Sequence, residues 1–460
     1  MPDSTPHSSR VTRILERSPS WIFVLFAVAS AFSTYFCMYA FRKPFAAARF
    51  DGEFFAGSLV ALKTAIVVSQ ILGYACSKYI GIKVCSEISP ARRAWSLILL
   101  IVWAELALLL FAVLPGSWKV AAIFLNGLPL GMVWGLVVWY LEGRRTSEFL
   151  LAGLSCSYIL SSGIVKDIGR AVLEGGLAAW WRKVPLAGDL ISPWLANVNE
   201  SWMPFVTGLH FLPLFLLSVW MLNQLPRPTV ADVEERTARQ PMNAEERMVF
   251  IRQFLPGLLM LCVAYFFLTA YRDFRDNYQV ELFNDLGYPY AQHKTIISKT
   301  ETWVAFGIMG ALALLNLVRD NRRALITAFA MMSFGLVLLG LGTFLLETRR
   351  ISGYVWMALT GFGSYLAYVP FGSMLFDRLI AATKTAGTAV FAIYLADAIG
   401  YTGSVLVQLF KDLATGNASR LVFFKGFTYA MSVGGAACLM GACVYFAAQA
   451  RRAQPGAQAP

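Results

Sequence analysis

The chain has 460 residues, of which 57% are hydrophobic and only 14% are charged. Soluble domains usually carry about a quarter charged residues, so this composition excludes a chain built from two or three soluble domains. The formal net charge of +12 does not indicate a nucleic-acid partner, because membrane proteins gather Lys and Arg in their cytoplasmic loops. We therefore expect the lipid bilayer to surround most of the chain.

Long apolar runs recur from Trp21 nearly to Ala448, and each can cross about 30 Å of hydrocarbon as a helix. The sequence therefore predicts an all-α, polytopic membrane protein. The first run has the length of a full span and follows a long polar N-terminus, so we expect it to remain as a transmembrane helix. The twelve predicted spans lie near 20–47, 55–80, 95–115, 118–141, 149–173, 202–224, 250–272, 290–318, 324–346, 352–377, 386–411 and 421–449.

The first predicted span ends in YFCMYAFRKPF, where Arg42 and Lys43 follow some twenty almost uncharged residues. Tyr35 lies seven residues before Arg42 and Tyr39 three before it, so at helical spacing all three share one face. A charge at the bilayer centre costs about 2.5–3.5 kcal/mol and usually faces a cavity or a partner. In the alternative interpretation, Arg42 lies at the outer end of its helix and reaches water, and the tyrosines are packing or interfacial aromatics.

The stretch LPRPTVADVEERTARQPMNAEERMVF, between the sixth and seventh spans, is the only long segment that is charged and contains proline. It predicts an N-terminal six-helix bundle over 1–224, a cytoplasmic linker over 225–249 and a C-terminal six-helix bundle over 250–460. Lys and Arg are frequent in the N-terminal tail, in short loops of the same side and after the last span. The positive-inside rule therefore places both termini in the cytoplasm, although the opposite loops also hold arginines such as Arg349 and Arg350.

The seventh predicted span repeats the first, because YFFLTAYRDFR begins at Tyr265 as YFCMYAFRKPF begins at Tyr35. Arg272 thus takes the place of Arg42. Two further matches occur at nearly the same offset, RRA at 92–94 and 322–324 and Lys-Thr at 63–64 and 294–295. This agreement indicates a duplicated six-helix unit. Parallel six-span repeats, with a site between them near the bilayer midplane, describe the major facilitator fold.

Two arginines brought together from equivalent spans would repel each other, and an anion with several oxygens would relieve this. Guanidinium groups bind phosphate or carboxylate through two parallel hydrogen bonds. We therefore expect a small anionic solute to bind between Arg42 and Arg272, with the hydroxyls of Tyr35, Tyr39 and Tyr265 as further hydrogen-bonding groups.

Two acidic residues lie deep in later spans. Glu301 is about eleven residues into the eighth span and Asp397 about as far into the eleventh. Buried carboxylates in transporters often relay protons or balance a fixed cation, so both are candidates for proton coupling. In the alternative interpretation, Glu301 forms a structural ion pair with Lys299 of the same helix.

The residues YFCMYAFRKPF resemble the first-span signature of the organophosphate:phosphate antiporters, the glycerol-phosphate and hexose-phosphate transporters of the major facilitator superfamily. In that family a tyrosine seven residues before an arginine–lysine pair lines the site, and the arginine binds phosphate. The stretch GYACSKYIG in the second span is similar to the context of the family's site lysine. The resemblance implies a site that includes Tyr35, Tyr39, Arg42, Lys43, Lys78 and Arg272, in this family or a bacterial branch of it.

We find no Walker loop, no metal-ligand cluster and no Ser-His-Asp arrangement with supporting context, so we expect no enzyme activity, no cofactor and no metal. The main hypothesis is a secondary active transporter of a small anionic solute, such as a phosphorylated one. It would work as a monomer by alternating access in a bacterial inner membrane. The alternatives are a proton-coupled transporter of another small solute and a membrane sensor of the same fold. No kinase or DNA-binding module is fused, which disfavours the sensor.

Overall fold

The computed structural model describes residues 9–141, 144, 146–185, 187–228, 244–289, 292–318, 320–383, 385, 389–414 and 419–453. Helices account for most of these residues, and the only extended pairing among them is an isolated bridge between Phe54 and Ala61. The prediction of an all-α chain is therefore confirmed.

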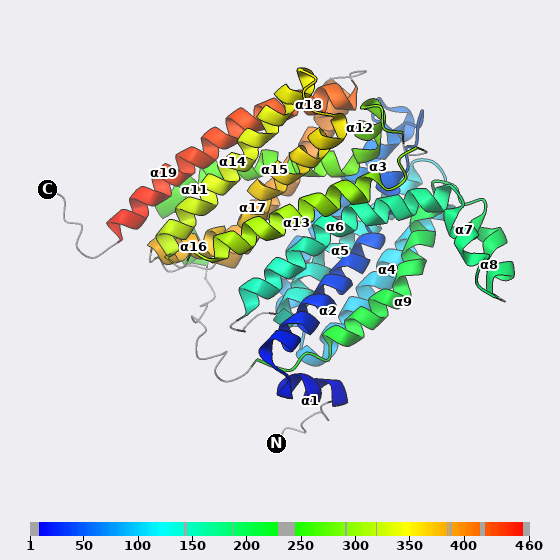
Figure 1. Cartoon of the computed structure of the whole chain (residues 1–460), viewed down its shortest axis with the longest axis horizontal. Coiled ribbons are helices and arrows are strands. Elements are labelled where there is room, and N and C mark those ends of the chain that lie inside the picture. Colours follow the sequence, from blue (N-terminus) through cyan, green and yellow to red (C-terminus); the bar gives the residue numbers. More distant parts are fainter. Residues whose placement is uncertain are drawn as a thin grey trace. The chain divides into compact units, whose positions relative to one another are not determined.

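The chain divides into two compact units, and Figure 1 labels their helices. The first unit comprises Met1–Phe45 and Gly73–Thr237, and the second comprises Ala46–Leu72 and Ala238–Pro460. The division passes through the helix α3 (Leu62–Glu87), whose first eleven residues belong to the second unit. Residues 229–243 of the predicted linker 225–249 lie outside the described part of the chain, so a domain boundary at this linker stays a prediction.

The other helices of the first unit follow the predicted spans and add short segments before the first span and between later ones. They are α1 (Arg10–Arg17), α2 (Ser20–Ala40), α4 (Arg93–Val113), α5 (Trp118–Leu141), α6 (Ser147–Leu173), α7 (Gly176–Trp181), α8 (Ala187–Leu195) and α9 (Met203–Leu222), with the 3-10 turn η3 (Pro90–Arg92). Within this unit α2 packs on α6 and α9, and α4 packs on α5 and α9.

The second unit repeats these pairings. Its helices are α11 (Ala244–Asn277), α12 (Gln279–Asp285), α13 (Ile296–Asn316), α14 (Asn321–Glu347), α15 (Gly353–Ser373), α16 (Leu375–Thr383), α17 (Ala389–Ala414), α18 (Arg420–Ala430) and α19 (Ala436–Arg452), with the short segments η2 (Phe55–Gly57) and η4 (Met431–Gly435). The turn η1 (Pro44–Ala47) spans the boundary between the two units. Here α11 packs on α17 and α19, and α14 packs on α15 and α19. The first span of each half thus packs on the fifth and sixth, and the third on the fourth and sixth, as a duplication requires.

Each of the twelve predicted spans corresponds to a helix, or to two consecutive helices in the tenth and twelfth spans. Seven helical segments of the described chain are long and apolar enough to cross a membrane: Ser20–Ala40, Arg93–Val113, Trp118–Leu141, Met203–Leu222, Glu245–Asn277, Asn321–Glu347 and Arg420–Arg452. Many large apolar side chains on these helices are exposed, among them Leu99, Val337 and Val444. Such surfaces suit hydrocarbon, and the chain has a polytopic membrane fold.

A buried lysine explains why residues 46–72 belong to the second unit. Lys63 of α3 is 1% exposed, and its ammonium donates to the carbonyl oxygens of Ala46 (3.0 Å) and Ala48 (2.8 Å) and pairs with Glu281 of α12. Next to it, the hydroxyls of Thr64 and Tyr278 lie 2.9 Å apart. The start of α3 and the chain before it are thereby fixed to the segment that follows α11.

We predict that Lys63→Met lowers the thermal midpoint of the purified protein in detergent. Removing one partner of a buried ion pair leaves the other charge uncompensated, which costs about 3–5 kcal/mol. Lys294→Met is the matched control, because Lys294 is the repeat equivalent of Lys63 and is exposed. Equal midpoints for the two variants would contradict the prediction, and Lys63→Met combined with Glu281→Leu should recover part of the loss.

Candidate functional site

In the first unit, Arg42 lies just beyond the end of α2. The amides of Arg42 and Lys43 donate to the carbonyl of Tyr39 at 3.1 and 2.9 Å, which closes the last turn. Pro44 cannot continue the helix, and the C-terminal end of a helix attracts cations. Because α2 has 21 residues and is about 32 Å long, Arg42 stands at one end of a span. Its side chain is nevertheless only 5% exposed.

Aromatic rings surround the buried guanidinium of Arg42. Its Cζ lies 4.1 Å from the ring centroid of Tyr74 and 5.6 Å from that of Tyr39. The ammonium of Lys78 lies 5.3 Å from the same Tyr74 ring. Two cations therefore lie against one aromatic side chain. A cation–π contact that is shielded from water contributes about 2 kcal/mol or more of stabilisation.

The predicted tyrosines of the first span join this group. Tyr35 is 3% exposed and meets Tyr39 edge-on with ring centroids 5.7 Å apart. Its ring also packs against Trp134 of α5, with ring centroids 4.9 Å apart. Lys43 is buried directly after Arg42. The structure thus gathers Tyr35, Tyr39, Arg42 and Lys78 within the first unit, around the unpredicted Tyr74.

Close contact between α3 and α5 fixes the position of Tyr74. A Cβ atom at Gly73 would lie 2.3 Å from the carbonyl oxygen of Phe124, and one at Gly131 would lie 2.7 Å from that of Tyr74. Both glycines are therefore needed for the two backbones to approach. The spacing of Tyr74 and Lys78, four residues apart on one helix face, is the signal that would have identified Tyr74 from the sequence.

In the second unit, Arg272 of α11 has an acidic neighbour. Its Nη2 lies 2.6 Å from Oδ1 of Asp273, and its Cζ lies 4.0 Å from the ring centroid of Tyr368 on α15. The other oxygen of Asp273 accepts a hydrogen bond from Ser404 of α17 at 2.8 Å. In the repeat, Asp273 occupies the place of Lys43. The first repeat therefore carries two positive charges at these positions and the second carries a balanced pair.

Tyr265 and Asp397 extend the group around Arg272. The Tyr265 hydroxyl donates to Oδ1 of Asp397 on α17 at 2.8 Å, and its ring stacks on that of Tyr368 with centroids 5.3 Å apart. A Cβ at Gly400 would lie 2.5 Å from the hydroxyl oxygen of Thr269 and 2.9 Å from the Tyr265 ring, so α17 needs glycine to approach α11. Within the second unit, the structure thus brings Tyr265, Arg272 and Asp397 together.

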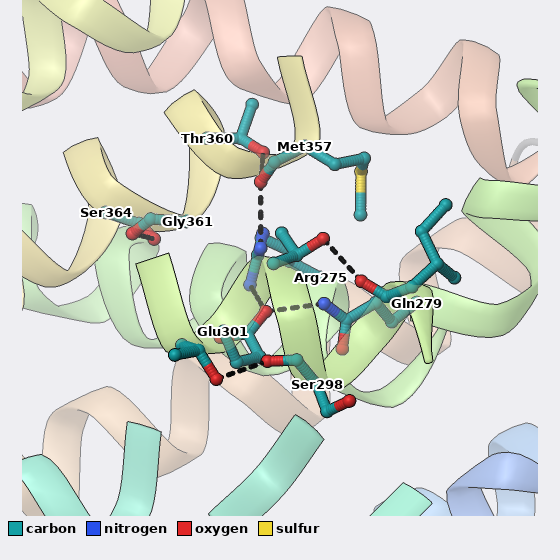
Figure 2. Close-up of polar contacts among 11 residues, drawn as sticks. Arg275, Gln279, Ser298, Glu301, Met357, Thr360, Gly361 and Ser364 are labelled. Carbon is teal, nitrogen blue, oxygen red and sulfur yellow. Dashed lines mark hydrogen bonds and ion pairs between the residues drawn. The ribbon is translucent and has the colours of Figure 1, made fainter. Parts of the chain in front are cut away.

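Glu301 belongs to a buried polar network with Arg275 and Gln279, shown in Figure 2. Its Oε1 pairs with Nη1 of Arg275 at 2.9 Å and accepts from Gln279 at 2.6 Å, and Arg275 also donates to the carbonyl of Met357 at 2.8 Å. Lys299 is exposed. The alternative pairing of Glu301 with Lys299 is therefore wrong, because the partner comes from α11 and not from the same helix.

Gly361 makes room for the guanidinium of Arg275 (Figure 2). A Cβ at this position would lie 2.5 Å from Nη2 and 2.8 Å from Cζ of Arg275. We predict that Gly361→Ala displaces Arg275 from Glu301 and lowers the thermal midpoint, since overpacking costs about 1–3 kcal/mol.

Gly310→Ala is the control for this substitution, because a Cβ at Gly310 on α13 has no atom within 4 Å. Alanine favours a helix over glycine by about 1 kcal/mol, so this variant should keep or raise the midpoint. A Gly361→Ala midpoint equal to that of Gly310→Ala would contradict the proposed displacement of Arg275.

The fold is similar to those of solved transporters. A D-xylose-proton symporter matches with a TM-score of 0.59 at 13% identity, covering 91% of this chain and 97% of that one. The nucleoside transporter NupG matches with a TM-score of 0.55 at 12% identity, covering 92% and 99%. A bacterial homologue of the human drug peptide transporters PepT1 and PepT2 matches with a TM-score of 0.56 at 11% identity, covering 94% and 100%. These likenesses show the major facilitator fold, as predicted.

No curated protein matches the sequence. A family model matches residues 44–449, which are most of the chain and include both units. The chain therefore belongs to the family of unknown function DUF5690.

Proposed function

We propose that this protein is a secondary active transporter that moves a small anionic solute across the membrane by alternating access. The major facilitator fold supports transport, because the solved structures that share it include a xylose–proton symporter and a nucleoside transporter. The observation that carries the anionic substrate is the meeting of Arg42 and Lys78 at Tyr74.

The side chains of the first unit suit an anion with several oxygens. The guanidinium of Arg42 offers a planar fork of N–H donors, and the ammonium of Lys78 offers a compact charge. The hydroxyls of Tyr35 and Tyr39 are further donors. Hydrogen bonds between charged groups and a phosphate or carboxylate are roughly twice as strong as neutral ones, so these residues would hold such a group firmly.

The two units differ in the charge that follows the repeated arginine. Arg272 forms an ion pair with Asp273 at 2.6 Å. In the first repeat, the position equivalent to Asp273 is Lys43, which adds a second positive charge beside Arg42. We therefore assign the main anion contacts to the first unit. Arg272 and Tyr265 would adjust the fit. A phosphorylated solute, exchanged as in the organophosphate:phosphate antiporters that the first span resembles, is the specific form of this proposal.

Proton coupling is a second candidate, and the pair of Tyr265 and Asp397 favours it. The Asp397 carboxylate holds the Tyr265 hydroxyl at 2.8 Å, and that ring stacks on the Tyr368 ring that also contacts Arg272. Protonation of Asp397 would weaken its bond to Tyr265 and loosen the group around Arg272. Glu301 is a weaker proton carrier, because Arg275 already balances its charge.

We expect Arg42→Ala to reduce uptake of radiolabelled phosphate or glycerol 3-phosphate into phosphate-loaded proteoliposomes by about 10- to 100-fold. This is the equivalent of losing a charged hydrogen bond worth about 1.5–3 kcal/mol. Uptake by Arg42→Lys should lie between those of the wild type and Arg42→Ala, because lysine keeps the positive charge but lacks the planar set of N–H donors of arginine.

Arg93→Ala is the matched control for Arg42→Ala. Arg93 also contacts an aromatic ring, with its Cζ 4.8 Å from the Trp139 ring centroid, but it lies at the start of α4. Uptake by Arg42→Ala at the level of Arg93→Ala would refute the anion site. Tight phosphate binding to the wild type without uptake would refute transport and favour a sensor.

For the second candidate, we expect Asp397→Asn to abolish proton movement that depends on added phosphate, recorded with a pH-sensitive dye inside the liposomes. Tyr265→Phe removes the hydrogen bond and keeps the carboxyl, so it should shift the pH dependence of uptake while proton movement persists. Undiminished proton movement in Asp397→Asn would exclude Asp397 as the carrier.

A further inference from the structure

The carboxyl group of Glu105 is buried without a partner in the middle of α4. The side chain is 6% exposed, and neither oxygen has a hydrogen bond or an ion pair with any residue that the structure describes. Three other buried acids differ from it, because Asp273, Glu281 and Glu301 each pair with a cation. Glu105 was not among the residues that the sequence singled out.

Gly208 of α9 provides the space for this carboxyl. A Cβ at Gly208 would lie 2.2 Å from Oε2 of Glu105 and 3.1 Å from the ring of Phe41. The neighbouring amide of Asn126 does not reach Glu105, because it donates to the carbonyls of Ala104 and Phe41 at 3.0 Å each. The carboxyl therefore lies between α4, α9 and the turn after α2, which is the turn that carries Arg42.

None of the charged and titratable groups that the structure describes around α4 forms a hydrogen bond with the Glu105 carboxyl. On α5, Lys119 donates to the carbonyl of Phe111 and to Ser201, and Tyr140 donates to Asn223. On α9, His210 bonds to Val206 and Trp181. The remaining groups on the elements packed against α4, and at its own start, are Arg42, Lys43, Arg92 and Arg93, and none of them bonds to Glu105 in the described structure.

An ionised carboxylate without a partner is too costly in an apolar interior, and such a group takes up a proton instead. We propose that Glu105 is a proton-binding site, protonated in this structure, that releases its proton during the transport cycle. This inference rests on the proposed transport function and deepens it.

The proton on Glu105 would favour binding of the anion. Loss of the proton would place a negative charge beside the turn of Arg42 and Lys43, where it opposes an anion and attracts the guanidinium. Proton and anion would therefore bind together, and anion affinity would fall as the pH rises through the titration of Glu105. In Glu105→Gln, which mimics the protonated state, anion affinity should not change over that range.

An infrared titration of the full chain in proteoliposomes tests the proton site without any solute. The difference between wild type and Glu105→Gln isolates the carbonyl stretch of the protonated Glu105 carboxyl. We expect this band at about pH 6 and at least a tenfold loss of its intensity by about pH 10. A band absent at about pH 6, or unchanged at about pH 10, would overturn the proposal.

Carbodiimide labelling of the wild type does not depend on a variant that folds. Carbodiimides react with protonated carboxyls in apolar surroundings, so peptide mass spectrometry should find Glu105 labelled about tenfold more than the ion-paired Glu301. Equal labelling, or stronger labelling of Glu301, would overturn the proposal.

The failure of this proposal can be told apart from the failure of the transport function. If Glu105 titrates but the protein takes up no phosphate, the proton site is supported and transport of phosphate is refuted. Phosphate uptake with the same pH dependence in wild type and Glu105→Gln would leave transport standing and refute the coupling.

Discussion

A charge among apolar helices is stable only when other groups of the protein neutralise it or replace its water, and the polar interior of this protein follows from that constraint. In the second unit, carboxylates neutralise the buried cations. The ion pairs are Lys63–Glu281, Arg272–Asp273 and Arg275–Glu301. In the first unit, Arg42 and Lys78 lie against the ring of Tyr74. The face of an aromatic ring stabilises a cation through its electron density.

The duplication of the chain is visible in helix packing, but the two copies have diverged in their charges. The first span of each half packs on the fifth and the sixth. The arginine near its end is kept, whereas the next position changed from lysine to aspartate and the lysine of the following span changed from buried to exposed. Two copies of one scaffold therefore differ in the charges that they hold at equivalent positions.

Hydrophobic run lengths were sufficient to predict the number and order of the spans, because a bilayer dictates helix length. Helical spacing and the internal repeat were sufficient to single out Tyr35, Tyr39, Tyr265 and Arg272. These patterns could not identify charge partners. Glu301 pairs with Arg275, 26 residues away, and not with Lys299 two residues away, because interhelical geometry decides the partner. Glu105 was missed although it lies about eleven residues into the third predicted span, as Glu301 and Asp397 do in theirs. Only the coordinates show that its carboxyl oxygens have no hydrogen-bond partner among the described residues.

The environment of Lys63 has a consequence for which amino acid this position accepts. An ammonium group has three N–H donors, and the structure offers it three acceptors: two main-chain carbonyls and the carboxylate of Glu281. Arginine carries the same charge, but its donors lie in a wide planar fork that does not match three acceptors converging on one point. The geometry of this site therefore favours lysine over arginine, although both carry the same charge. Homologous chains that keep this contact should have lysine at this position.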